Sequence, residues 1–191
     1  MPTIYKYSGP NSQIRETIID DETALWMMRM CVGEGGFKCS QEKCSAMLWS
    51  IMNRWNLWPG RKKFNSILHL MRAFSQPINP KWQYGGELAL RYKNRSAGSP
   101  ERLKRRAYIC NLTKTKIESK SPQIVKAVKA FQIGVLFPPK CLTNITMPRL
   151  SNWASLPSTP DKNPQGLDID GDWFFEDKNL IPGVVKIEQT E

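Results

Sequence analysis

The sequence predicts a mainly helical α+β fold, in which a helical core precedes a loop-rich, partly β C-terminal region. Apolar residues recur at helical spacing in segments that begin with capping residues and end at Gly or Pro. Beyond residue 138 the chain changes to prolines, short apolar runs and acidic residues. With 191 residues, 40% of them hydrophobic, the chain can bury one core. We expect an N-terminal arm over residues 1–19, one domain over 20–150, and an acidic segment over 151–191 that packs on that domain.

The first predicted helix begins at Asp20 or Asp21, whose side chains suit an N-cap. A buried stripe at helical spacing follows, made of Ala24, Leu25, Met28 and Cys31 or Val32. The helix ends among Gly33, Gly35 and Gly36. Glu34 therefore lies at a helix C-terminus, where the helix dipole disfavours negative charge.

Four more helices are predicted from their end signals. Ser40 caps a central helix that runs to about Trp55, and Asn65 or Ser66 begins a helix that stops before Pro77. Ser99-Pro100 and Ser121-Pro122 each combine a capping serine with proline at the first helical position. The second of these two helices ends at Gly134. Further on, Trp173-Phe174-Phe175 is expected in a short hairpin.

The formal charge of +11 is unevenly distributed. Residues 91–129 hold twelve Lys or Arg and two Glu, whereas residues 151–191 hold eight acids and three Lys. We expect the acidic turn at residues 168–172 to pair with the basic segment. The basic segment suits a polyanion such as nucleic acid, an anionic membrane surface or a bacterial wall polymer, and the alternative is a solvated helix face. The predicted polyanion contacts are Arg102, Lys104, Arg105 and Arg106.

The sequence contains neither an export signal nor an apolar run of the roughly 18 residues that a membrane span needs. Five cysteines are an odd number, which favours synthesis in a reducing cytoplasm, although a Cys39–Cys44 disulfide stays open. A zinc site of Cys31, Cys39, Cys44 and His69 would match no standard spacing. We expect no metal and no cofactor.

A single histidine, His69, falls within an amphipathic helical pattern, where a structural role on the helix surface is expected. Its isolation disfavours zinc and Cys-His peptidases, which leaves carboxylate chemistry. Glu34 is the best placed carboxyl group, because glycines flank it and Met30, Val32 and Phe37 can desolvate it. Desolvation favours the protonated form, so Glu34 could donate a proton to a glycosidic oxygen, whereas the alternative is an ordinary turn.

Three stretches of the chain resemble the cell wall hydrolase family that includes spore-cortex-lytic enzymes. They are residues 30–36 (Met-Cys-Val-Gly-Glu-Gly-Gly), residues 46–54 (Ala-Met-Leu-Trp-Ser-Ile-Met-Asn-Arg), and residues 64–68 (Phe-Asn-Ser-Ile-Leu) leading to 73–76 (Ala-Phe-Ser-Gln). The resemblance covers about residues 22–82. It implies a lysozyme-like fold over residues 20–150 and cleavage of peptidoglycan between N-acetylmuramic acid and N-acetylglucosamine, typically as a lytic transglycosylase.

The resemblance assigns roles to individual residues. Glu34 would be the general acid and then the base, Asn53 a buried residue that holds the substrate site together, and Phe74 and Ser75 part of the cleft wall. A hydrolytic mechanism would need a second carboxylate across the cleft. The available candidates are Glu87, Asp168, Asp170 and Asp172.

Trp82, Tyr84 and Trp173 are candidates for stacking on sugars, with core packing as the alternative. The leading hypothesis is a bacteriophage endolysin or virion-associated wall hydrolase, with peptidoglycan and other virion proteins as partners. Such a protein would be made in the host cytoplasm and would act at the cell wall or within a phage particle. The alternatives are a nucleic-acid-binding protein and an inactive, lysozyme-like structural virion protein.

Overall fold

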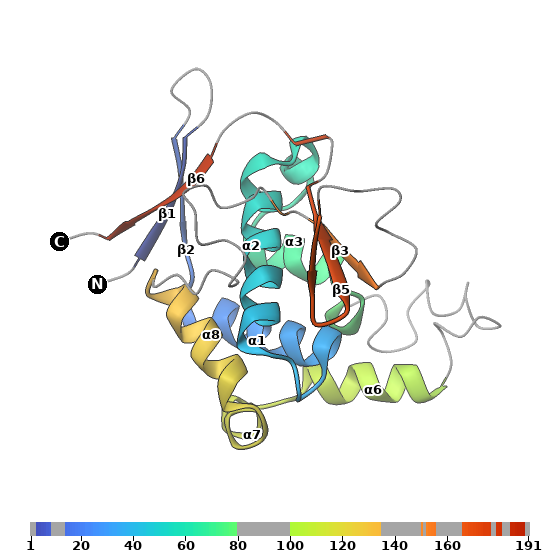
Figure 1. Cartoon of the computed structure of the whole chain (residues 1–191). Coiled ribbons are helices and arrows are strands. Elements are labelled where there is room, and N and C mark those ends of the chain that lie inside the picture. The colour runs from blue at the N-terminus through green and yellow to red at the C-terminus, as the bar shows by residue number, and fades with distance from the viewer. Residues whose placement is uncertain are drawn as a thin grey trace.

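The computed structural model describes residues 3–8, 14–79, 100–134, 150, 152–155, 166–176, 179–180 and 184–189. Within them lie six α-helices and two three-stranded antiparallel sheets (Figure 1). The predicted mainly helical α+β fold class is confirmed. In the described residues, no helix combines the length and the apolar character that a membrane span requires.

Helices α1 (Asp21–Gly35), α2 (Gln41–Leu57) and α8 (Pro122–Gln132) pack together to form the core. Almost every residue of α2 is buried, as its apolar sequence predicts. Where α2 meets α8, the rings of Trp49 and Phe131 pack edge to face, with their centroids 5.4 Å apart. Methionines of α1 and α2 fill the interior, among them Met27, Met30, Met47 and Met52.

The predicted N-caps of the first three helices are confirmed. Asp20 accepts a hydrogen bond from the Thr23 backbone at 2.7 Å, and Ser40 accepts one from Lys43 at 3.0 Å. The same contact at 3.1 Å joins Ser66 to the backbone of His69 in helix α3 (Ile67–Phe74). Each cap satisfies an N–H group that the helix itself leaves without a partner.

Each of two short 3-10 helices has a proline at its first or second position. Helix η2 (Pro59–Lys63) follows α2, and helix η3 (Gln76–Ile78) follows α3. His69 is exposed on α3, in contact with the ring of Phe64, as its place in an amphipathic pattern predicts.

Helix α6 (Pro100–Cys110) forms where the Ser-Pro signature predicts it, and α8 begins at Pro122. Helix α7 (Lys114–Lys120), which precedes α8, was not predicted; Thr113 caps it. Ser121 does not cap α8 as expected, because its hydroxyl donates to the carbonyl of Phe37 and so ties this turn to the end of α1.

Within the predicted extended arm over residues 1–19, residues 3–8 and 14–18 are strands of a sheet. Strands β1 (Thr3–Ser8) and β2 (Ile14–Ile18) form a hairpin, and β1 also pairs with β6 (Val184–Gln189). The sheet order is β2-β1-β6, so the two ends of the chain lie side by side (Figure 1).

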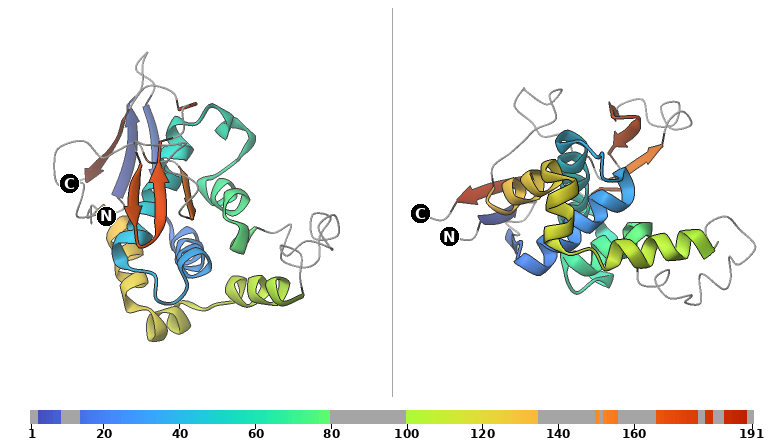
Figure 2. Two further views of the ribbon diagram at one scale, coloured as in Figure 1. Left: turned by 45° about the vertical axis from the view of Figure 1, so that its right-hand side comes forward. Right: turned by 90° about the horizontal axis from the view of Figure 1, so that it is seen from below.

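The second sheet has the order β3-β5-β4 and packs against α2 through β3 (Asn152–Ser155). Strands β4 (Leu167–Ile169) and β5 (Asp172–Phe175) form the hairpin that the aromatic run predicts, and Phe174 is fully buried in the core. Both views in Figure 2 show this sheet well separated from α6. These two elements form opposite sides of the site described below.

A disulfide joins Cys31 of α1 to Cys44 of α2, with Cα atoms 5.5 Å apart. The Cys39–Cys44 pairing considered from the sequence is therefore wrong. The packing of α1 on α2 brings Cys31 to Cys44, whereas Cys39 is buried as a free thiol against Gly35. The bridge ties α1 to α2 one turn before Glu34.

Candidate functional site

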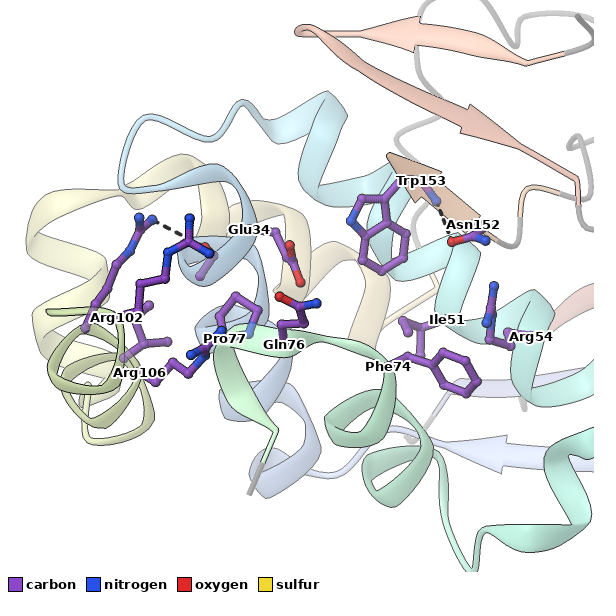
Figure 3. A pocket seen from close by; sticks show the side chains of 13 residues that line it. Glu34, Ile51, Arg54, Phe74, Gln76, Pro77, Arg102, Arg106, Asn152 and Trp153 are labelled. Carbon is purple, nitrogen blue, oxygen red and sulfur yellow. Dashed lines mark hydrogen bonds between the residues drawn. The ribbon is translucent and has the colours of Figure 1, made fainter. Parts of the chain in front are cut away.

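A cleft of about 380 Å³ lies beside the C-terminal end of α1 (Figure 3). Its walls come from α1, α2, α3, η3, α6 and β3, so residues that are more than 100 positions apart in the sequence, such as Gly33 and Trp153, meet there. The lining residues are Gly33, Glu34, Ile51, Arg54, Phe74, Gln76, Pro77, Arg102, Arg105, Arg106, Ile109, Asn152 and Trp153.

Glu34 lies in the last turn of α1, as predicted, and its side chain is half-buried. The helix ends at Gly36, whose φ of 70° favours glycine. The Ser75 hydroxyl donates a hydrogen bond of 2.7 Å to Oε1 of Glu34. Ser75 is fully buried at the end of α3, so the bond fixes the carboxyl group from the floor of the cleft.

The pKa of Glu34 is raised above the ordinary value for glutamate. Burial is the largest cause, because it disfavours the charged form, and the negative charge of Asp172 adds to it. Hydrogen bonds from Ser75 and Trp153 and the positive charge of Lys43 act in the opposite direction without cancelling the rise. The carboxyl group therefore keeps its proton to a higher pH than an exposed glutamate, as a general acid requires.

One side of the cleft, which we call the aromatic wall, consists of Arg54, Phe74, Asn152 and Trp153. The guanidinium of Arg54, a residue only 7% exposed, lies 4.2 Å from the ring centroid of Phe74. The preceding residue, Asn53, donates a buried hydrogen bond of 2.9 Å to the carbonyl of Leu150. Neighbouring residues of α2 thus support Phe74 directly and anchor the chain just before the strand that carries Trp153.

The other side, which we call the cationic wall, consists of Arg102, Arg105 and Arg106 of α6. Figure 3 shows Arg102 and Arg106 on one side of Glu34 and Trp153 on the other. Arg105 donates a long hydrogen bond of 3.5 Å to the carbonyl of Gly33. Burial lowers the pKa of Arg106, as do the charges of Arg102 and Arg105, whereas the negative charge of Glu34 raises it. The three arginines and Glu34 therefore share one electrostatic environment.

The structure brings together six of the predicted site residues, namely Glu34, Phe74, Ser75, Arg102, Arg105 and Arg106. Asn53 is buried and does not line the cleft; its side-chain amide donates a hydrogen bond to the backbone carbonyl of Leu150. Lys104 is exposed on α6 outside the cleft. Trp82 and Tyr84 lie outside the described residues.

Trp173, a candidate for sugar stacking, does not line the cleft. Its indole packs against Gly166, where a Cβ would collide with it. The tryptophan of the cleft is Trp153, on the neighbouring strand. Asn152 and Ile109, which also line the cleft, were not predicted from the sequence, and Arg54 and Gln76 were noted only within the stretches that resemble the family.

Glu34 is the only carboxyl-bearing side chain among the described residues that line the cleft. Asp172 is close enough to influence its pKa, but it forms an ion pair of 2.9 Å with Lys43. Asp168 accepts a hydrogen bond from the Gly171 backbone within its own turn. The acidic turn therefore pairs with Lys43 of α2, which corrects the expected pairing with residues 91–129. Glu87, the other candidate, lies outside the described residues.

The described part of the chain contains no group of three or more His, Cys, Asp or Glu side chains placed to hold a metal ion. Comparison with family models, with curated proteins and with solved structures finds no match. The chemistry of the cleft itself therefore has to carry the functional argument.

Proposed function

We propose that this protein cleaves the glycan strands of bacterial peptidoglycan between N-acetylmuramic acid and N-acetylglucosamine, as a lytic transglycosylase of the cell wall hydrolase type. One observation carries the proposal: a half-buried glutamic acid with a raised pKa is held by Ser75 in an open cleft beside Trp153. Carboxyl groups with these properties serve as acids in glycoside cleavage.

In the first step, the proton on the carboxyl group of Glu34 passes to the glycosidic oxygen as the bond between this oxygen and C1 of the muramic acid breaks. The electron pair of that bond leaves with the oxygen, and C1 acquires oxocarbenium character. The Glu34 carboxylate then removes the proton from the 6-hydroxyl of the same sugar, whose oxygen attacks C1. A 1,6-anhydro ring closes, and Glu34 regains its proton.

Transglycosylation fits this cleft better than hydrolysis does. The intramolecular hydroxyl is both the nucleophile and the source of the returning proton, so one carboxyl group suffices. A hydrolytic route uses a second carboxylate to activate water or to stabilise C1. Of the described acids, Asp172 comes closest to that role, but its pairing with Lys43 already engages its charge.

Trp153 gives the cleft a surface that suits a sugar. Its side chain is half-buried, lines the cleft and hydrogen bonds to Glu34. An indole offers an apolar face to the CH groups of a pyranose and a polar N–H at its edge. We place the muramic acid or its neighbour against this ring, with the scissile oxygen at Glu34.

The two alternative functions receive less support. Arg102 and Arg105 line the same cleft as Glu34 instead of forming a separate basic face, and nucleic-acid binding gives a protonated glutamic acid no role. A structural virion protein without activity would have no need of the raised pKa. We assign the activity to a bacteriophage endolysin or virion-associated enzyme that is made in the host cytoplasm and acts at the wall.

The decisive experiment compares the wild type with Glu34→Gln on purified peptidoglycan. Glutamine keeps the shape of the side chain but cannot donate the proton, so activity should fall by about 10²- to 10⁴-fold. Glu118→Gln, the same change at an exposed residue of α7, is the matched control and should leave activity intact. Mass spectrometry of the products should show anhydromuropeptides.

Three results would contradict the proposal. Full activity of Glu34→Gln would remove Glu34 from the mechanism. Products with reducing ends alone would establish hydrolysis instead of transglycosylation. An inactive wild type that melts cooperatively would favour the structural virion protein, and salt-sensitive retention of DNA by such a protein would favour nucleic-acid binding.

A further inference from the structure

We infer that the cleft selects glycan strands by their negative charge, through an oxyanion subsite that the cationic wall forms on one side of Glu34. The inference rests on the proposed function, because it takes the glycan bond to be cut at Glu34. It adds a specificity that the position of the acid alone does not imply: a neutral glycan of the same backbone should be a poor ligand.

The arrangement of the arginines along α6 places them on one face of the helix. Arg105 and Arg106 follow Arg102 by three and four positions, so both lie one helical turn from it on the same side of α6. All three line the cleft. Arg106 is only 6% exposed, while Arg102 and Arg105 reach into solvent at the cleft's edge. The subsite thus has one fixed, buried cation and two outer cations.

The electrostatics of this cluster favour an anionic ligand. Burial is the main cause of the lowered pKa of Arg106, and repulsion by the charges of Arg102 and Arg105 adds to it. The raised pKa of Glu34 means that this residue adds no negative charge while it holds its proton. An oxyanion that enters the cleft relieves the repulsion, and the planar guanidinium groups can bind it through paired N–H donors.

Peptidoglycan offers such oxyanions at a suitable distance from the scissile bond. Muramic acid bears a lactyl group with its stem peptide, which carries carboxylates, and some walls attach phosphate polymers to the glycan. Arg102 and Arg106 lie on the other side of Glu34 from Trp153 (Figure 3). A strand with one sugar against Trp153 and its scissile oxygen at Glu34 would therefore extend toward α6 on that other side. The ligand chemistry is therefore a carboxylate or phosphate on that continuation.

Comparison with Lys104 distinguishes a defined subsite from the general attraction of a basic protein to a polyanion. It lies on the same helix between Arg102 and Arg105 and has the same charge, but it is exposed outside the cleft. In a long-range attraction, each of the three positive side chains contributes equally to binding, and salt weakens that contribution. A subsite depends on the arginines alone.

The experiment measures binding without cleavage, in the Glu34→Gln background, by sedimentation with insoluble glycan at fixed ionic strength. The added changes are Arg102→Gln with Arg105→Gln, and Lys104→Gln as the matched control. The ligands are intact sacculi, sacculi stripped of phosphate polymers by acid, glycan freed of stem peptides by an amidase, and uncharged chitin. We expect the arginine pair to weaken binding to intact sacculi about tenfold or more, with chitin binding unchanged and Lys104→Gln within about twofold.

The treated ligands identify the source of the anion. If the arginine effect survives acid stripping and disappears after amidase treatment, the subsite binds the stem peptide. If it disappears after acid stripping, the subsite binds wall phosphate. If it survives both treatments, the subsite binds a carboxylate at the lactyl position, which the amidase sets free when it hydrolyses the amide bond to the stem peptide.

Two outcomes overturn the inference: a loss for the arginine pair no greater than the square of the Lys104→Gln loss, which is what two charges without a subsite would give, or an equal loss on chitin. Because binding is measured in a variant that does not cleave, the result is independent of activity. If the wild type releases no products while the arginines still confer charge-selective binding, the proposed reaction fails and the subsite stands.

Discussion

The two walls of the cleft differ in how the protein holds them. The aromatic wall is fixed, because Arg54 packs on Phe74 and Asn53 anchors the chain just before the strand of Trp153. The cationic wall belongs to a single helix, and two of its three arginines reach into solvent. Glu34 lies between the walls (Figure 3).

This difference suits the two walls to different tasks: one positions the sugar at the acid, and the other attracts the glycan strand. A fixed, half-buried ring determines where the sugar lies relative to the acid, and its contribution is hardly screened by salt. Solvated cations act over a longer range, so they determine which strand approaches and are weakened by salt. We therefore expect the aromatic wall to control the rate of bond cleavage and the cationic wall to control binding.

The largest effect in this comparison is expected for Trp153→Ala. Loss of the ring removes the surface that aligns the sugar at Glu34 and admits water to the acid, so kcat/KM should fall about 10- to 100-fold, mainly through kcat. The loss should be the same at low and high ionic strength. Release of anhydromuropeptides, followed against salt concentration, measures it.

Two companion variants complete this test. Trp153→Phe keeps an aromatic face and should recover most of the activity. Arg102→Gln with Arg105→Gln should act mainly on KM, with an effect that shrinks as salt rises. A strongly salt-dependent loss for Trp153→Ala, or a loss confined to KM, would contradict the division of tasks between the walls.

Ser75→Ala tests the hydrogen bond that holds Glu34 between the two walls. We expect a loss of activity smaller than that of Trp153→Ala. The Ser75 hydrogen bond lowers the pKa of Glu34, so its removal should raise that pKa further. Activity that needs protonated Glu34 falls as pH rises through this pKa, and the falling limb of the pH profile of kcat/KM should move to higher pH. Below that limb, activity should drop about threefold to tenfold, because the carboxyl group is less well aligned.

Ser45→Ala provides the matched control for this variant. Ser45 is also a buried serine, but its hydroxyl donates to the Gln41 carbonyl within α2 and is not among the causes of the Glu34 pKa shift. Its removal should leave the pH profile in place. A falling limb that stays fixed or moves to lower pH in Ser75→Ala would show that Ser75 does not set the pKa of Glu34.

The walls also differ in how far the sequence predicts them. Local signals predicted the helix ends: Asp20, Ser40 and Ser66 cap as expected, and Gly36 and Gly134 lie at C-termini with positive φ. Those ends place Glu34 in the last turn of α1, and the family resemblance supplied its partner Ser75. The arginines of α6 were visible as a charge cluster, although the exclusion of Lys104 required the helix to be placed against α1.

What the sequence did not predict depends on contacts between distant segments. Trp153 lies on a four-residue strand in a proline-rich region, too short for any periodicity to identify. The pairing of β1 with β6 joins opposite ends of the chain. Helix α7 has one buried residue, Ile117, and so lacks an apolar stripe. The Cys31–Cys44 bridge follows from helix packing, which cysteine spacing alone does not specify.

The smallest expected effect tests which wall keeps water from the acid. Because the pKa of Glu34 is raised in the folded protein, the folded state binds more protons than the unfolded chain as pH rises above the ordinary glutamate range, and stability falls through that window. Glutamine cannot ionise and escapes this cost. The Tm of Glu34→Gln should therefore exceed that of the wild type by a few degrees at neutral pH, and the difference should vanish below about pH 4.

The same measurement in two backgrounds separates the walls. Trp153→Ala admits water to Glu34, which lowers the cost of its ionisation, so the gain from Glu34→Gln should shrink there. Arg102→Gln with Arg105→Gln takes positive charge away from the vicinity of the Glu34 carboxylate, so the gain should persist or grow. Equal gains in both backgrounds would mean that the two walls shield the acid alike, and the raised pKa would then belong to the end of α1 itself.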